Sequence, residues 1–230
     1  DLCQHLPVPA IVLGLSGNLT EQALMNVETF YKRYGSLVVC NRDKIDATDP
    51  DYIEGTGKSY GAEFTLRYHS TFFNLYAAYS LSWVRINNGG VVYYPRYDRR
   101  HHLNVLAVLQ PLRGLSTTVR WEYGSGFPFS QTVGYLDRLM FDDAVPGQFE
   151  LETGSPYVLL GPKNAARLPS YHRLDISASY NFTIIGLDAN VGVDLINVYD
   201  HKNIFYFDRK TAQRVNMLSF YPSATLTVEY

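Results

Sequence analysis

The sequence predicts an all-β protein, a transmembrane antiparallel up-and-down β-barrel of about nine strands. Three observations predict it: alternation of apolar and polar residues, a strict order of short and long connections, and aromatic residues near strand ends. The alternation is longest in Met217–Tyr230, whose fourteen residues place an apolar stripe opposite a largely polar one. Soluble strands usually run about five or six residues, whereas about 9–11 residues cross a bilayer at a tilt.

Eight further segments show the same two-residue period. In Ser59–His69, for example, Phe64 and Leu66 face one side while Glu63 and Arg67 face the other. The nine predicted strands, in chain order, are Ala10–Gly17, Leu24–Val39, Ser59–His69, Phe73–Trp83, His102–Gln110, Leu115–Tyr123, Ser170–Phe182, Leu187–Leu195 and Met217–Tyr230.

The connections between these segments alternate in length. Short turns are predicted at 18–22, near Ser70, at 111–114 and at 184–186, and long loops at 41–58, 87–100, 124–169 and 200–216. An outer-membrane barrel has this order, with short periplasmic turns at one end and longer extracellular loops at the other. Aromatic residues near the strand ends fit interfacial girdles; they are Tyr31, Tyr60, Tyr68, Phe73, Trp83, Trp121, Tyr123, Tyr180, Phe182, Tyr199 and Tyr230.

Composition narrows the function classes. Twenty basic and 22 acidic residues nearly balance, so nothing points to nucleic acid. No run approaches the roughly 18 apolar residues of a transmembrane helix. A half-solvated soluble sheet would also alternate, so two alternatives stay open. One is a small self-contained barrel acting as a pore, adhesin or membrane hydrolase, and the other is a secreted β-sandwich that binds a ligand.

In a barrel, the polar faces of the strands line the lumen. The charged residues predicted there are Glu63, Arg67, Arg120, Glu122, Arg173, Asp175, Asp188 and Asp194. Ligand contacts are expected from aromatic and basic residues of the long loops, namely Tyr93, Tyr94, Arg96, Tyr97, Phe127 and Phe129.

No metal site, cofactor or catalytic residue is predicted. His101 and His102 are consecutive, so a strand would turn them to opposite faces. The loop acids Asp46, Asp49 and Asp51 lack the glycine and closing glutamate of a calcium loop. No nucleophile elbow, zinc-protease helix or phosphate loop is present either.

The two cysteines carry a separate prediction. The first hairpin turns near residues 20–22, so positions whose numbers sum to about 42 or 43 face each other. Cys3 and Cys40 meet that condition. We predict a disulfide between them, because the expected compartment is oxidising.

Four stretches in this order and spacing resemble the C-terminal barrel region of TonB-dependent outer-membrane receptors, particularly those of the Bacteroidota type. They are Tyr97-Asp98-Arg99-Arg100-His101-His102-Leu103-Asn104, Tyr123-Gly124-Ser125-Gly126-Phe127-Pro128-Phe129, Arg167-Leu168-Pro169-Ser170-Tyr171-His172-Arg173-Leu174-Asp175 and Asn197-Val198-Tyr199-Asp200-His201-Lys202-Asn203. The residues of the first two stretches also have structural roles. Asp98 can pair with Arg99 or Arg100, and Gly124 and Gly126 release the backbone from a strand into a loop.

The resemblance implies a 22-strand barrel in the bacterial outer membrane, filled by an N-terminal plug and importing a scarce nutrient such as a siderophore or glycan with energy relayed by TonB. The whole chain, 1–230, then corresponds to the C-terminal segment of that barrel, without plug or TonB box, and is not an enzyme. The implied partners are outer-membrane lipid, the missing plug and N-terminal strands, TonB through the plug, the barrel-insertion machinery through Tyr230, and a surface-exposed substrate-binding lipoprotein. A charged, aromatic-rich loop set does not tell which substrate is carried.

Overall fold

A computed structural model describes residues 8–41, 48–140, 150–209 and 211–229 of the chain. In these residues the regular structure is entirely β. Within the same ranges, no helix is long enough and apolar enough to span a membrane.

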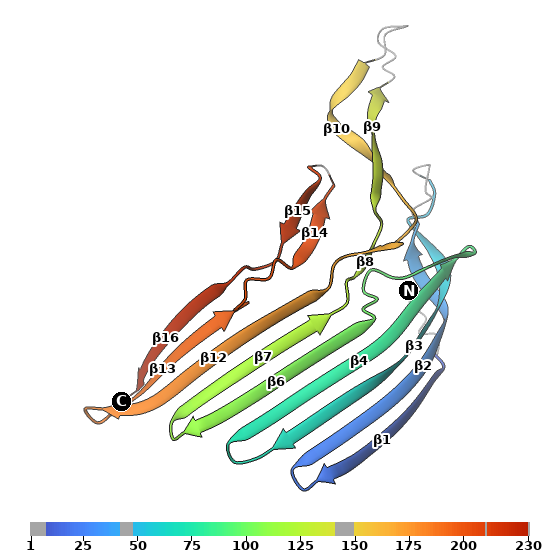
Figure 1. Cartoon of the computed structure of the whole chain (residues 1–230). Coiled ribbons are helices and arrows are strands. Elements are labelled where there is room, and N and C mark those ends of the chain that lie inside the picture. The colour runs from blue at the N-terminus through green and yellow to red at the C-terminus, as the bar shows by residue number, and fades with distance from the viewer. Residues whose placement is uncertain (1–7, 42–47, 141–149, 210, 230) are drawn as a thin grey trace.

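The molecule is built around one antiparallel sheet whose principal strands follow one another in chain order (Figure 1). The strands of this sheet pair in the order in which they follow one another along the chain, so the sheet is an up-and-down meander. Its strands are β1 (Ala10–Thr20), β2 (Ala23–Cys40), β3 (Tyr52–His69), β4 (Phe73–Asn88), β6 (His101–Leu112), β7 (Leu115–Gly124), β12 (Tyr171–Ile184), β13 (Leu187–Ile196) and β16 (Tyr221–Glu229).

All nine predicted strands are therefore confirmed, and so is their pairing. The short turns lie together at the lower end of the sheet in Figure 1, and the long loops rise from the other end. The turn between β12 and β13 consists of two residues. Ile185 and Gly186 both have positive φ, 53° and 79°, which is the backbone of a type I′ hairpin turn.

Two strands are longer than the alternation predicts. β3 begins at Tyr52 rather than Ser59, and β4 continues to Asn88 rather than ending at Trp83. The added residues include Glu54, Lys58 and Arg85, so the contrast between an apolar and a polar face fades there although the backbone pairing continues.

The predicted last strand is too long at its start. Residues 217–220 are not strand, and β16 begins at Tyr221. In this stretch, backbone N–H groups donate to residues of the preceding loop instead of to a neighbouring strand. The Met217 N–H donates to the Asn203 carbonyl (2.8 Å) and the Phe220 N–H donates to the Asp200 carboxylate (2.9 Å).

Three of the long loops contain further short strands that the sequence did not predict. β5 (Val91–Tyr93) pairs with β4, whereas the others form separate two-stranded sheets beyond the loop end of the main sheet. These pairs are β8 (Pro128–Phe129) with β11 (Ala166–Arg167), β9 (Thr132–Met140) with β10 (Glu150–Leu160), and β14 (Ile204–Asp208) with β15 (Gln213–Asn216).

The main sheet is a single layer, so it encloses almost no apolar core. Among the described residues the buried hydrophobic side chains are only Val39, Tyr93 and Ala189. One face carries the apolar stripes, including Leu13, Leu15 and Val191, which are strongly exposed. A soluble β-sandwich would cover that face with a second sheet, and the described chain has none there.

The sheet does not close on itself. Its path runs from β1 to β16, and in the described chain each of these pairs with a single neighbour. Every residue of both strands is exposed. The fold is thus an open, antiparallel sector of a barrel wall.

Candidate functional site

Three of the four sequence motifs meet at the loop end of the sheet, around the carboxylate of Asp98. This side chain is fully buried. One oxygen accepts from the Val84 backbone N–H (2.8 Å), and the other pairs with the Arg167 guanidinium. Arg167 also donates to the carbonyls of Asp98 and Gly126 (both 3.1 Å). The buried charge is therefore paired and fully hydrogen-bonded, the condition under which burial is tolerated.

The prediction that Asp98 pairs with a neighbouring arginine is confirmed for Arg100, which lies 3.9 Å from the carboxylate. The closer partner, Arg167, is 69 residues away in sequence and was not predicted. Arg99 turns elsewhere: its guanidinium lies 3.8 Å from Glu122 and 4.3 Å from the centre of the Phe127 ring. Burial lowers the pKa of Arg99, against the opposing effect of Glu122.

Glycines let the two crossing loop segments come together. A Cβ on Gly126 would collide with the carbonyl of Leu168, and one on Gly124 would meet the Arg99 guanidinium 2.6 Å away. The Leu168 N–H then donates to the Phe127 carbonyl at 2.9 Å. The expectation that these glycines release the chain from β7 therefore has a steric basis in the packing of its neighbours.

The fourth motif ties the ends of β12, β13 and β16 together. Asn197 is fully buried and donates to the carbonyls of His201 (3.0 Å) and Leu218 (3.1 Å). Asn203 holds both backbone groups of His172, at 3.0 and 2.9 Å. Asn197 and Asp200 both adopt positive φ, a conformation that Asn and Asp tolerate best among residues with a side chain. The motif is therefore a structural clasp.

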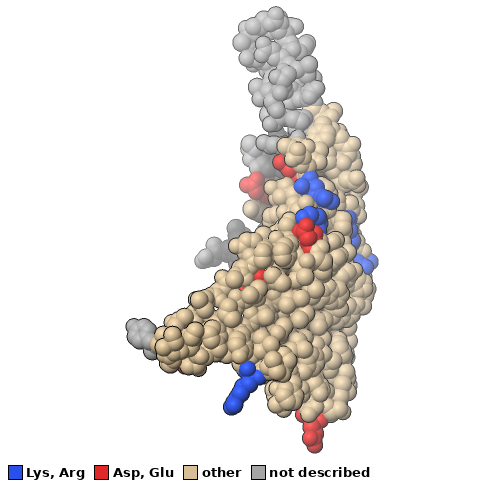
Figure 2. All heavy atoms as spheres, turned by 60° about the vertical axis from the view of Figure 1, so that its left-hand side comes forward, with Lys and Arg blue, Asp and Glu red and all other residues tan. Residues whose placement is uncertain are grey.

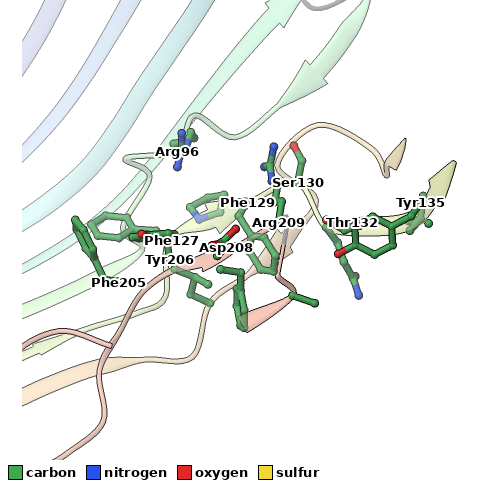
Figure 3. Close-up of a pocket in the computed structure, with 17 residues that line it drawn as sticks. Arg96, Phe127, Phe129, Ser130, Thr132, Tyr135, Phe205, Tyr206, Asp208 and Arg209 are labelled. Carbon is green, nitrogen blue, oxygen red and sulfur yellow. The ribbon is translucent and has the colours of Figure 1, made fainter. Parts of the chain in front are cut away.

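Above this framework lies a cavity of about 820 Å³, here called the loop pocket. Its walls come from the start of the β7–β12 loop, with Phe127 and Phe129, and from the β14–β15 hairpin, with Phe205 and Tyr206; Figure 3 shows these residues around the pocket. Phe129 and Phe207 stack across it with ring centres 5.8 Å apart. Arg96 and Arg209, both exposed, also line it, together with the half-buried Asp208. An aromatic cavity with cationic groups suits a ligand that combines ring faces with negative charge.

The six predicted ligand residues fall into two groups. Arg96, Phe127 and Phe129 line the loop pocket, whereas Tyr93 is buried beneath the Lys163 ammonium (4.0 Å from the ring centre). Tyr97 is 68% exposed and lies outside the pocket.

Tyr94 packs among arginines rather than lining the pocket. Its ring lies 5.2 Å from the guanidinium of Arg167 and 5.5 Å from that of Arg100. Burial alone would raise the pKa of Tyr94, but hydrogen bonds and charge from Arg100 and Arg85 lower it below its usual value. This residue belongs to the framework around Asp98.

The aromatic residues that the β14–β15 hairpin contributes to the loop pocket were not predicted; they are Phe205, Tyr206 and Phe207. Their signal in the sequence is a run of three aromatic residues inside a segment expected only to loop back. The run became informative once the structure placed it on a hairpin facing the β7–β12 loop.

The strand register places all eight charged residues predicted for the lumen on one face of the main sheet. Near β7 and β12 they neutralise one another: Arg173 lies 2.9 Å from Asp175 and Arg120 lies 3.5 Å from Glu122. This polar face is opposite the apolar stripes, as a barrel wall between water and lipid requires.

Some residues that the sequence analysis singled out lie outside the described residues, and one of them is Cys3 of the predicted disulfide. Ala10 aligns with Lys32 in the first hairpin, so facing positions do sum to 42 there, and Cys40 ends β2 exposed. Cys3 is not among the described residues, and the disulfide stays a prediction. Tyr230, expected to contact the insertion machinery, also lies outside them, as does Asp46.

A meander with one apolar face, one polar face, short turns at one end and elaborate loops at the other defines the wall of an outer-membrane β-barrel. The sequence agrees: residues 13–199 match the family described as "TonB dependent receptor-like, beta-barrel". The chain belongs to this family, whose members are transport receptors of the bacterial outer membrane rather than enzymes. Among curated proteins, none matches this chain.

Solved structures show the same fold. The ferric-catecholate import receptor Fiu of E. coli K12 superposes with a TM-score of 0.60 at 15% identity, covering 96% of this chain and 27% of that one. The ferripyoverdine receptor of Pseudomonas aeruginosa, bound to ferripyoverdine, gives 0.57 at 13% identity, covering 96% and 26%. FpvAI in complex with pyocin S2 gives 0.56 at 13% identity with the same coverage. This chain spans about a quarter of the length of each.

Proposed function

We propose that this chain is the C-terminal part of the barrel wall and loops of a larger TonB-dependent receptor that takes up a scarce nutrient. The observation that carries the proposal is the open main sheet, whose edge strands β1 and β16 are uncovered. Lipid does not tolerate unpaired backbone groups, so a spanning sheet must be closed. Further strands of the same receptor would pair with both edges.

The rest of the proposed assembly follows from the two faces. The apolar face meets outer-membrane lipid, and the polar face lines a lumen that holds a plug domain through which TonB acts. A full barrel of 22 strands would leave the strands before β1 and the plug to be supplied by chain upstream of this sequence. Tyr230 is the proposed contact of the insertion machinery, and a substrate-binding lipoprotein on the cell surface is a further proposed partner of the loops.

For the nutrient, we propose an anionic chelate of the siderophore type bound at the loop pocket. The aromatic walls offer ring faces for stacking, and Arg96 and Arg209 offer positive charge. Two structural neighbours receive ferric chelates, by their descriptions, which supports this choice over a neutral glycan.

The size of the natural protein tests the assembly. Outer membranes of the source cell are separated on a denaturing gel, and bands are mapped by peptides from this sequence. We expect these peptides in a band several times heavier than 26.1 kDa. A band at 26.1 kDa whose mobility changes on heating would instead mean a small self-contained barrel, and the receptor proposal would be wrong.

The pocket is tested by uptake in cells that carry the receptor. Phe205→Ala with Phe207→Ala removes two aromatic walls, and we expect accumulation of a radiolabelled ferric siderophore to fall at limiting concentration. Tyr97→Ala is the matched control, because it removes an exposed loop aromatic outside the pocket. Equal uptake by all variants, or uptake of a maltooligosaccharide in place of every chelate tested, would contradict the proposed ligand.

A further inference from the structure

Three basic residues form one row across the apolar face of the sheet. Arg33 of β2 is aligned with Lys58 of β3, and Lys58 is aligned with Arg85 of β4. Successive residues of a strand alternate between faces, so this basic row shares its face with Tyr31, Tyr60 and the other apolar stripes. Neither the lumen nor the loop pocket uses these side chains.

The basic row lies two residues beyond an aromatic row on the same face. Tyr31, Tyr60 and Trp83 are aligned with one another, and the rings of Tyr60 and Trp83 stack with centres 5.4 Å apart. Aromatic residues of a barrel mark the boundary between hydrocarbon and headgroups.

The number of residues between the short turns and the basic row also places this row at the boundary between hydrocarbon and headgroups. From the short-turn ends, Arg33 is the eleventh residue of β2, Lys58 the twelfth of β3 and Arg85 the thirteenth of β4. A tilted strand needs about 9–11 residues to cross the hydrocarbon. The basic row is therefore at the level of the lipid headgroups, on the loop side.

A pocket of about 480 Å³ lies at the row. Arg33, Lys58 and Arg85 line it together with Tyr31, and no acidic residue does. A register shift in β2 between Tyr34 and Leu37 interrupts the regular ladder just beyond the row. Bulges of this kind redirect side chains next to functional sites.

The positive charges of the row are not neutralised within the described chain. None of the three makes an ion pair there. Arg85 contacts the ring of Tyr94, with 5.8 Å to its centre. The nearest acid on this face of β3, Glu54, is four residues from Lys58. Like charges placed opposite each other on neighbouring strands are destabilising, so the row fits an anion supplied from outside the protein.

We propose that the basic row binds the phosphate groups of a lipid in the loop-side leaflet of the outer membrane, with its acyl chains lying along the aromatic row below. Three cations aligned on neighbouring strands and lining one pocket match a headgroup with more than one phosphate. Charge-assisted hydrogen bonds of guanidinium to phosphate are strong and specific. The site would fix the lipid next to β2–β4 and so adds a lipid-binding function to the uptake proposed above.

The test is lipid binding by the complete receptor in detergent micelles. Diphosphoryl lipid A is titrated into wild type and into R33Q/K58Q/R85Q, and bound lipid is counted by native mass spectrometry. We expect the triple variant to lose affinity by about tenfold or more, because one charge-assisted hydrogen bond contributes about 1.5–3 kcal/mol and about 1.4 kcal/mol is tenfold. Wild-type binding should weaken as salt rises.

Two further variants separate charge loss from misfolding. K32Q/R67Q/R113Q removes three positive charges outside the pocket and should bind lipid A as wild type does. R33K/K58R/R85K keeps the charges and should retain most of the affinity. Equal binding by wild type and R33Q/K58Q/R85Q, or equal binding of a phosphate-free glycolipid, would overturn the proposal. So would displacement of lipid A by low millimolar inorganic phosphate, which would mean a free-anion site.

Discussion

At the scale of single residues, the buried Asp98 is the point on which the loop end of the sheet depends. It connects β4, through the Val84 N–H, with Arg167 at the far end of the longest loop. The sequence predicted a charge pair at Asp98 because arginines follow it directly. It could not predict Arg167, because only the folded loop brings residues 69 positions apart together.

Replacing Asp98 with alanine should destabilise this region strongly. The change leaves Arg167 and the Val84 N–H without their acceptor, and breaking a buried ion pair costs about 3–5 kcal/mol; the lower end applies because the Arg167 side chain is 30% exposed. Urea unfolding of the receptor in lipid vesicles, followed by tryptophan fluorescence, measures the loss. Asp98→Asn keeps an acceptor for Val84 and should lose less; equal stability of all three proteins would contradict the role.

A second prediction at this scale concerns acid. The hydrogen bond from Lys202, helped by the Phe220 N–H, lowers the pKa of Asp200 below its usual value and outweighs the effect of burial. A carboxyl whose pKa is lowered by folding contributes stability above its unfolded pKa, and this contribution is lost as pH falls through the lowered value. The clasp at 197–203 should therefore loosen only in strong acid.

Hydrogen exchange of peptides from 197–220, corrected for the intrinsic pH dependence of exchange, checks this. Protection in wild type should fall on acidification through the lowered pKa. Asp200→Asn should be less protected at neutral pH and should show no such step. If protection fell by the same amount on acidification in wild type and in Asp200→Asn, the change would be caused by the titration of another group.

At the scale of elements, the alternation of residues was sufficient for the nine spanning strands and their order. It failed where strands pass beyond the membrane, as in the first six residues of β3, because both faces then meet water and the contrast disappears. It also missed the β9–β10 and β14–β15 hairpins. Those strands pack on each other rather than between lipid and lumen, so no two-sided environment imposes a period on them.

The Ile185–Gly186 turn carries strain that a substitution should release. Isoleucine at positive φ is unfavourable, by about 1–2 kcal/mol for residues with a Cβ, and its side chain is 96% exposed. Asparagine tolerates this conformation and is favoured in type I′ turns. Ile185→Asn should therefore raise the urea midpoint by an amount equivalent to about 1 kcal/mol. A lower midpoint would mean that the isoleucine side chain makes a stabilising contact in the membrane.

The crossing at Gly126 should not accept a side chain. Gly126→Ala would place a methyl group against the Leu168 carbonyl, and overpacking of this kind costs about 1–3 kcal/mol. We expect faster proteolysis of the β7–β12 loop in intact cells. Gly134→Ala is the control in the same loop, because its Cβ would be 3.6 Å from the Leu159 side chain, an ordinary contact. Unchanged proteolysis of Gly126→Ala would show that the loops can separate without consequence.

At the scale of the whole molecule, the two faces of the sheet assign its surroundings. Charged side chains gather toward the loop side of the molecule, and most of the lower surface visible in Figure 2 has none, apart from single residues near the lower edge. The sequence predicted the separate apolar and polar faces of the sheet, because successive residues of a strand point to opposite faces. The loop pocket could not be predicted, because two loops that are distant in sequence form it.

Neighbouring residues of β7 test the assignment of faces. Val119 lies on the apolar face and Thr118 on the polar one. Val119→Arg should cost about 2–4 kcal/mol near the middle of the bilayer and reduce the folded receptor in outer membranes. Thr118→Arg, facing the proposed lumen, should be tolerated. If Thr118→Arg reduced the folded receptor more than Val119→Arg did, the assignment of the lipid-facing and lumen-facing sides would have to be reversed.

The strictly sequential strand order has a consequence for how the chain folds. At the short-turn end, neighbouring strands are joined by only two or three residues, so their contacts are local and little chain entropy is lost when each hairpin forms. The longest of the other connections joins β7 to β12, which are separated by 46 residues between Gly124 and Tyr171. The entropy lost on closing a loop grows only slowly with its length. Pairing of Gly124 with Tyr171 nevertheless requires this long loop to close before β7 and β12 can form hydrogen bonds. The slow event in assembling this wall should therefore be the joining of two preformed meanders, β1–β7 and β12–β16, across the loop that carries the pocket.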